Sequence, residues 1–293
     1  MGNTVEVSHI TKSYHGQFVV NDISFNIAPG EVFGLIGPNG AGKTTIIRML
    51  LDIIRPDSGE LQVLGSGIDD GIKDRIGYLP EERGLYRSLT VMDSLMYLGA
   101  LKNKHSKNRS MELLEKMNLL PNKDMKISEL SKGMQQKIQL IAAISHYPQF
   151  IILDEPFSGL DPVNMKLVKD MILELGKQGK TILISTHMMD QVERMCDRIL
   201  MIQKGKMVLY GSVNEIKSRF GKNAIQLEFE GELKSLPGVK RMNHSGNYAE
   251  LILDPGADAQ EVLRNIMKSV RVNRFEISSP SLNEIFIQVE AKA

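Results

Sequence analysis

The stretch from Gly37 to Thr45 constrains the fold of this chain more than any other. It reads Gly-Pro-Asn-Gly-Ala-Gly-Lys-Thr-Thr and fits the pattern G-x-x-x-x-G-K-[ST]. The apolar run Val32–Ile36 before it is short enough for a buried strand, and Ile46–Leu51 after it has the composition of a helix. Glycines allow the backbone angles of the tight turn between them. The pattern therefore predicts a strand–loop–helix unit of an α/β fold.

This loop is predicted to bind the phosphates of ATP or GTP. Its backbone N–H groups would point at phosphate oxygens, and the following helix N-terminus favours an anion. Lys43 would reach the β- and γ-phosphates, and the Thr44 hydroxyl would bind Mg²⁺. The predicted nucleotide-binding residues are Gly37, Pro38, Asn39, Gly40, Ala41, Gly42, Lys43, Thr44 and Thr45.

A second apolar run, Phe150–Leu153, ends in the carboxylates of Asp154 and Glu155. In open α/β sheets, ligands bind at the carboxyl ends of the strands. Asp154 suits the Mg²⁺ site, through water, and Glu155 would act as general base on the attacking water. The alternative, a surface Asp-Glu turn before Pro156, is disfavoured by the phosphate loop upstream.

Three further stretches resemble the ATP-binding subunits of ABC transporters. Leu130–Gln136 is similar to that family's signature L-S-G-G-Q, Ser158–Asp161 to its D-loop, and His187 to its switch histidine. Tyr14 lies where the family stacks an aromatic ring on adenine. The motifs follow the family's order from residue 14 to residue 187. The resemblance implies an ATPase in which Glu155, His187 and Lys43 are catalytic.

The signature residues are Ser131, Lys132, Gly133 and Met134. Ser131 is a good N-cap, so a helix from Lys132 to Tyr147 would offer a second anion site at its start. The resemblance implies that this site, with the D-loop residue Asp161, serves the ATP held by a partner subunit. Two copies, or this chain and a related one, would then close head-to-tail around two ATP molecules.

The chain departs from the family pattern at two places. Lys132 and Met134 replace the Gly and Gln of the usual signature, although Ser131 and Gly133 remain. Glu81 stands where the family often has a Gln that helps to bind Mg²⁺ and the attacking water. Glu81 could still approach Mg²⁺, so we include it with Thr44 and Asp154 as a metal ligand.

The composition is that of an ordinary globular protein. The formal net charge is +1 in 293 residues, so no basic field suggests nucleic acid. The single cysteine, Cys196, fits a reducing compartment and fills space on a helix. The start of the chain is mixed and polar, unlike a secretion signal, and no apolar run reaches about 18 residues. The resemblance to ABC transporter subunits then implies a peripheral protein on the cytoplasmic face of the membrane.

The sequence pattern divides the chain into two domains. Residues 1–220 are expected to form a mostly parallel sheet with an antiparallel β subdomain at residues 1–30 and an inserted helical subdomain at 84–148. Residues 221–293 are expected to form a small α+β domain. Its strands are predicted at Ile225–Phe229, Tyr248–Leu253 and Val272–Ile277, and its helices at Ala259–Val270 and Ser281–Val289. This domain resembles the C-terminal extension of sodium-extrusion and drug-export ATPases.

The sequence therefore predicts the ATP-hydrolysing subunit of an ABC exporter, which drives efflux of ions, drugs or peptides through a separate polytopic membrane permease. The cofactors would be ATP and Mg²⁺. The main alternative is an ABC-type ATPase that acts on nucleic acid or ribosomes; a P-loop kinase or GTPase and a regulatory module are less consistent with the motifs. The surface after Glu81 is the candidate permease contact, through Arg83, Leu85, Tyr86 and Arg87.

Overall fold

The computed structural model describes residues 2–66, 70–82, 84–102, 106–220, 224–233, 236–254 and 256–290. The chain forms two compact units, Met1–Tyr210 and Gly211–Ala293. This division falls before the expected boundary between residues 220 and 221. Helix α8 (Val213–Arg219), which Ser212 caps, groups with the second unit.

The first unit is built on a six-stranded sheet in the order β5-β6-β7-β3-β8-β9. The pairs β5–β6, β6–β7, β7–β3 and β3–β8 are parallel, as predicted for the strands that carry the motifs. Strands β3, β6 and β7 are buried along their whole length, which explains why their sequences are continuous apolar runs. The bounds are β3 (Val32–Ile36), β5 (Ile76–Leu79), β6 (Phe150–Asp154), β7 (Thr181–Thr186), β8 (Arg198–Gln203) and β9 (Lys206–Ser212).

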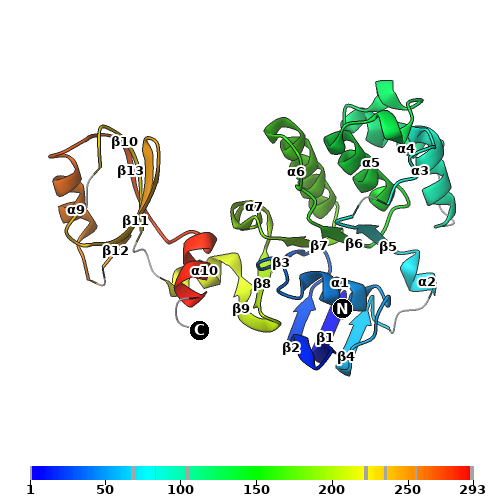
Figure 1. The fold of residues 1–293 in the computed structure, drawn as a ribbon, viewed down its shortest axis with the longest axis horizontal. Helices are drawn as coiled ribbons and strands as arrows, with labels where there is room; N and C mark the ends of the chain where they lie inside the picture. The colour runs from blue at the N-terminus through cyan, green and yellow to red at the C-terminus, as the bar shows by residue number, and fades with distance from the viewer. Residues whose placement is uncertain are drawn as a thin grey trace. The chain divides into compact units, whose positions relative to one another are not determined.

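Helices cover both faces of this sheet. Figure 1 shows α5 and α6 on one side, and α1 with the antiparallel strands on the other. Helix α6 begins at Pro162, where the fixed φ of proline suits the first helical turn. In the described part of the first unit, the helices outside the helical subdomain are α1 (Lys43–Leu50), α2 (Asp70–Lys73), α6 (Pro162–Lys177) and α7 (Met189–Met195).

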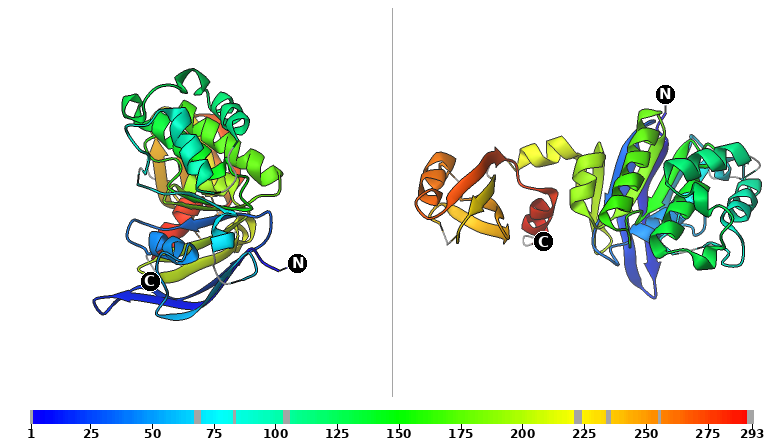
Figure 2. Two further views of the ribbon diagram at one scale, coloured as in Figure 1. Left: turned by 90° about the vertical axis from the view of Figure 1, so that its right-hand side faces the viewer. Right: turned by 90° about the horizontal axis from the view of Figure 1, so that it is seen from above.

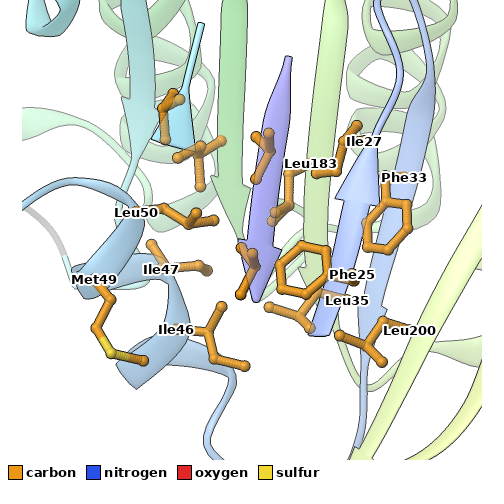
Figure 3. Packing of buried hydrophobic residues seen from close by; sticks show 14 of the residues in the cluster. Phe25, Ile27, Phe33, Leu35, Ile46, Ile47, Met49, Leu50, Leu183 and Leu200 are labelled. Atoms are coloured by element: carbon orange, nitrogen blue, oxygen red, sulfur yellow. The ribbon is translucent and has the colours of Figure 1, made fainter. Parts of the chain in front are cut away.

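The expected antiparallel strands form a second sheet, in the order β2-β1-β4. These strands are β1 (Val5–Tyr14), β2 (Gln17–Ile27) and β4 (Ser58–Val63). Their buried faces meet α1 and the six-stranded sheet in one hydrophobic core, shown in Figure 3. Phe25 of β2 stacks on Phe33 of β3, with ring centroids 5.6 Å apart. This core packs against the loop between β3 and α1 and holds it in place.

The inserted helical subdomain contains α3 (Val91–Ala100), α4 (Lys107–Lys116) and α5 (Lys132–Ile144), with short 3₁₀ helices at Leu120–Asn122 and Ile127–Glu129. Helix α5 packs on β5 and on α3 and α4. It ends at Ile144, earlier than the predicted Tyr147, because Tyr147 adopts a left-handed backbone conformation, with a φ of 57°. The signature helix therefore links the subdomain to the main sheet.

The second unit contains a four-stranded antiparallel sheet in the order β11-β12-β10-β13, with α9 packed on one face (Figure 2). Helix α9 covers this face with Val262 and Ile266. Helix α10 is held to the domain by Glu284, which accepts a hydrogen bond from Asn243 at 3.0 Å. The bounds are β10 (Ala224–Glu230), β11 (Val239–Ser245), β12 (Tyr248–Leu253), α9 (Ala259–Ile266), β13 (Arg271–Ser278) and α10 (Leu282–Glu290).

Strand β11 was not predicted from the sequence. It is an edge strand of mostly polar residues, so the alternation that reveals a half-buried strand is absent. Among the described residues of both units, no helix is long and apolar enough to cross a membrane.

Candidate active site

The loop between β3 and α1 has the conformation that its glycines predict. Gly42, the N-cap of α1, has a φ of 109°, and a Cβ there would lie 2.5 Å from Val19 O. At Gly37, with a φ of 154°, a Cβ would lie 2.2 Å from Ile202 O. Any larger residue at these two positions would push the loop away from β2 and β8.

The ammonium group of Lys43 lies inside this loop. It donates hydrogen bonds to Gly37 O at 2.7 Å and to Pro38 O at 3.2 Å, and it lies 3.9 Å from Glu155 Oε1. Burial lowers the pKa of Lys43, and the carboxylates of Glu155 and Asp154 oppose this shift. The loop is thus closed around a cation that can turn toward an incoming phosphate.

Asp154 ends β6 beside the first turn of α1. Its Oδ2 accepts a hydrogen bond from Thr44 Oγ1 at 3.3 Å, whereas Oδ1 is buried with no hydrogen-bond partner among the described residues. Burial raises the pKa of Asp154, and the carboxylates of Glu81 and Glu155 act in the same direction. The nearby Ser185 hydroxyl opposes this rise in pKa, although it forms no hydrogen bond among the described residues. An unpartnered carboxylate oxygen next to a threonine hydroxyl suits a hard divalent cation such as Mg²⁺.

Both carboxylate oxygens of Glu155 and its backbone N–H are held by neighbouring groups. Its Oε1 lies 2.9 Å from His187 Nδ1, and its Oε2 accepts a hydrogen bond from Thr186 Oγ1 at 3.0 Å. Its backbone N–H donates to Ser185 O at 2.8 Å, and its φ is 48°. The side chain is buried, so the Glu155 carboxylate is fixed rather than a mobile surface group.

These groups line one cavity of about 310 Å³ at the carboxyl ends of β3 and β6. The predicted residues that the structure brings together there are Asn39, Gly40, Ala41, Gly42, Lys43, Thr44, Thr45, Glu81, Asp154 and Glu155. Gly37 and Pro38 contact Lys43 from the loop backbone, and His187 contacts Glu155 from the end of β7.

Tyr14 and the signature residues lie elsewhere among the described residues, outside the lining of this cavity. Tyr14 ends β1, is 44% exposed and has Lys12 Nζ at 5.8 Å from its ring centroid. Ser131 caps α5 and accepts a hydrogen bond from Met134 N at 3.2 Å. Asp161 caps α6, and the hydrogen bonds that it accepts from Asn164 lower its pKa.

Sequence reasoning did not identify Val19, Thr186 or Gln136 as parts of the site. Val19 lines the cavity, Thr186 binds the Glu155 carboxylate, and the Gln136 amide reaches the Glu155 carbonyl. For Thr186, its place directly before His187 at the end of an apolar strand was an available signal. Val19 and Gln136 reach the site only through tertiary packing.

Comparisons with known proteins agree with this geometry. The family model "ABC transporter" matches residues 20–158, and the model "ATP-binding protein DrrA1-3-like, C-terminal domain" matches residues 211–289. The uncharacterized ABC transporter ATP-binding protein YhaQ of Bacillus subtilis is 38% identical over 96% of this chain and 97% of its own length. The chain belongs to the ABC transporter ATP-binding proteins.

Two further similarities extend the comparison. The Nod factor export ATP-binding protein I of Rhizobium sp. (strain N33) is 34% identical over 98% of this chain and 97% of its own length. A solved ATP-binding subunit of an ABC transporter, 31% identical, superimposes with a TM-score of 0.69 over 74% of this chain and 93% of that chain. The fold predicted from the sequence is confirmed, and the cavity belongs to an ABC ATPase, which binds ATP and hydrolyses it to ADP and phosphate.

Replacing Asp154 by asparagine should stabilise the nucleotide-free ABC ATPase. Because the folded-state pKa of Asp154 is raised, its contribution to stability is present at low pH and is lost as the pH rises through that pKa. At neutral pH the ionised carboxylate therefore costs stability, and Asp154→Asn should raise Tm by about 3 °C. The same variant should lose most of the further Tm increase that Mg²⁺ with ATP gives the wild type. A nucleotide-free Tm below that of the wild type would contradict the electrostatic account.

Proposed function

We propose that this ABC ATPase is the energy-supplying subunit of an exporter and acts on a separate polytopic membrane permease at the cytoplasmic face of the membrane. The observation that carries the proposal is the similarity to the Nod factor export protein, which covers both units of the chain. The match of residues 211–289 to a DrrA-like C-terminal domain supports it. This segment lies outside the ATPase domain, so the second unit also has a counterpart in a known ATP-binding protein. The transported compound would be chosen by the permease.

In this function the loop residues position the triphosphate. The N–H groups between Asn39 and Thr45 would donate to phosphate oxygens, and Lys43 would leave the carbonyls of Gly37 and Pro38 to bind the β- and γ-phosphates. Thr44 and Asp154 would hold Mg²⁺, with Glu81 nearby. When bound, Mg²⁺ would neutralise charge on the phosphate oxygens.

Glu155 would remove a proton from the water that attacks the γ-phosphate. The hydroxyl of Thr186 and the ring of His187 fix its two oxygens, so the carboxylate is oriented before ATP binds. His187 is 55% exposed at its side chain, which leaves its second ring nitrogen accessible to a γ-phosphate oxygen. Tyr14, also partly exposed, would stack on adenine.

Replacing Glu81 by glutamine should preserve hydrolysis. Glu81 lines the cavity with Asp154 and Glu155, so it adds a third negative charge close to the phosphates. The amide oxygen would still accept a hydrogen bond from water or coordinate Mg²⁺ without that charge, and we expect kcat within about threefold of the wild type. Steady-state phosphate release measures this. Complete loss of activity with unchanged nucleotide affinity would show that the carboxylate itself is required.

The position of the signature supports a head-to-tail dimer. At the start of a thirteen-residue helix, the Met134 N–H donates to the Ser131 hydroxyl, and Ser131 with the N–H groups of Lys132 and Gly133 forms the second anion site. In a closed dimer they would bind the γ-phosphate of the partner's ATP, with the ammonium group of Lys132 adding positive charge. Asp161 would lie at the same interface. Light scattering of the purified chain should show an ATP-dependent doubling of mass, and Ser131→Arg should abolish it.

The permease contact is proposed at a groove of about 390 Å³ beside the helical subdomain. Its lining is largely apolar and includes Ile76, Tyr78, Leu85, Leu98 and Leu101. The exposed rings of Tyr86 and Tyr97 pack edge to face at its border, with centroids 5.3 Å apart. An apolar groove with aromatic residues at its edge suits the apolar face of a short helix. Arg83, which the sequence placed at this contact, lies outside the described residues.

Charge reversal at Arg87 should weaken permease binding without changing hydrolysis by the isolated subunit. Arg87 is exposed next to Tyr86, far from the phosphate loop in sequence. We expect co-purification of the permease with Arg87→Glu to fall at least about fivefold. Lys166→Glu, on the exposed face of α6, is the matched control and should co-purify normally. Intact binding and transport by Arg87→Glu would remove this surface from the proposal.

A further inference from the structure

The segment from Glu155 to Asp161 runs along the N-terminal half of α5. A Cβ at Gly133 would lie 3.5 Å from Leu160 Cδ2 and 3.8 Å from Asn164 Nδ2. One turn further, the side-chain amide of Gln136 faces the backbone carbonyls of Glu155 and Pro156. The helix that starts at Ser131 is therefore in direct contact with the backbone of the base that acts on this subunit's own ATP.

Gln136 is the polar contact between the two. It is 4% exposed, and its Nε2 donates to Glu155 O at 3.4 Å and to Pro156 O at 3.5 Å. A single amide thus serves two buried carbonyls with long hydrogen bonds. A modest shift of α5 toward this segment would shorten both bonds, and a shift away would break both.

The backbone of Glu155 needs such support. Its φ of 48° lies in the left-handed region, which a residue other than glycine occupies only when its surroundings impose it. Its N–H is held by Ser185 O on β7, and its carbonyl oxygen is held by Gln136 on α5. Removing either contact would allow the backbone to relax and would turn the carboxylate away from Thr186 and His187.

We infer that Gln136 is a positioning residue for hydrolysis, and that it couples the signature helix to the catalytic carboxylate of the same subunit. This inference rests on the proposed function, in which Glu155 is the base and Ser131–Met134 bind the partner's ATP. Movement of α5 when the partner's γ-phosphate binds would tighten the Gln136 contacts and set the orientation of Glu155. Each ATP would then be hydrolysed only when the opposite signature is engaged.

The first test separates positioning from stability. Gln136→Met keeps the volume and removes the donor, and we expect kcat to fall about tenfold while KM for ATP stays within about twofold. Gln136→Glu keeps the shape of the side chain, and its kcat should fall by a similar factor. The test therefore does not depend on one variant. Lys137→Met is the matched control. The Lys137 ammonium is equally buried and donates at 2.9 Å, but to Met117 O inside the helical subdomain.

A kcat for Gln136→Met within twofold of the Lys137→Met value would overturn the inference. So would a loss of activity that follows Tm across all three variants. Glu155→Gln is measured in parallel to separate this inference from the proposed function. If Glu155→Gln is inactive and Gln136→Met is fully active, only the role of Gln136 fails; if Glu155→Gln is active, the assignment of the base fails as well.

The coupling is tested by a double-mutant cycle. If Gln136 transmits the state of the signature, Ser131→Ala and Gln136→Met act on one pathway, and the double variant should lose much less activity than the product of the two single losses. Ser131→Ala combined with Lys137→Met should show the full product. Multiplicative losses in both pairs would leave no coupling through Gln136.

Discussion

Replacing Glu155 by glutamine should lower kcat for ATP hydrolysis about a thousandfold while leaving ATP binding intact. The amide keeps the size of the side chain and can still contact Thr186 and His187, but it cannot remove a proton from water. Because the phosphate loop, Lys43 and Thr44 are unchanged, ATP should remain bound and unhydrolysed. Single-turnover hydrolysis with radiolabelled ATP measures the chemical step directly.

The same variant should remain dimeric in ATP, whereas the wild type should return to monomer as ATP is consumed. Glu174→Gln is a suitable control, because Glu174 lies on α6 and pairs with Lys116 at 2.6 Å, away from the cavity. It should hydrolyse ATP at the wild-type rate. Rapid hydrolysis by Glu155→Gln would mean that another group activates the water.

Replacing Lys43 by methionine should reduce affinity for ATP at least about a hundredfold. Lys43 is the buried cation of the phosphate loop, and its charge is desolvated before the nucleotide arrives. The hydrogen bonds that it would donate to two phosphates would be charge-assisted, and methionine can replace its packing but none of these bonds. Its loss also leaves Asp154 and Glu155 facing the triphosphate without the nearest positive charge. Titration with a fluorescent ATP analogue gives the affinity.

Lys166→Met is the control for that measurement. Lys166 lies on α6, is 77% exposed at its side chain and pairs with Asp170 at 2.8 Å. Its loss should leave ATP affinity unchanged, since a surface ion pair contributes little. If Lys43→Met binds ATP as tightly as Lys166→Met does, Lys43 does not hold the phosphates.

The parts of the site that could be predicted from sequence are those encoded by consecutive residues. The loop from Gly37 to Thr45 specifies its own turn, and the buried runs that end at Asp154 and Thr186 place Glu155 and His187 directly after neighbouring parallel strands, as observed. Short-range patterns suffice there because a parallel sheet aligns the ends of its strands.

The parts that sequence could not give depend on tertiary contacts. Gln136 reaches the carbonyl of a residue 19 positions away through the packing of α5, and no local pattern indicates which face of that helix it occupies. Strand β11 lacks the alternation of a half-buried strand because it is an edge. The structure groups helix α8 with the second unit, whereas the sequence pattern changes only near residue 220, because local patterns do not tell which unit a segment packs with.

The central claim is that this chain supplies ATP-driven motion to a separate membrane protein. The most direct test is an affinity pull-down of Glu155→Gln, with Mg²⁺ and ATP, from detergent-solubilised membranes of the source organism. The account predicts a polytopic membrane protein in matching amount, whose yield falls with Arg87→Glu. Recovery of only the self-dimer, or of ribosomal or DNA-bound proteins, would contradict the transporter assignment and favour an ATPase that acts on nucleic acid or ribosomes.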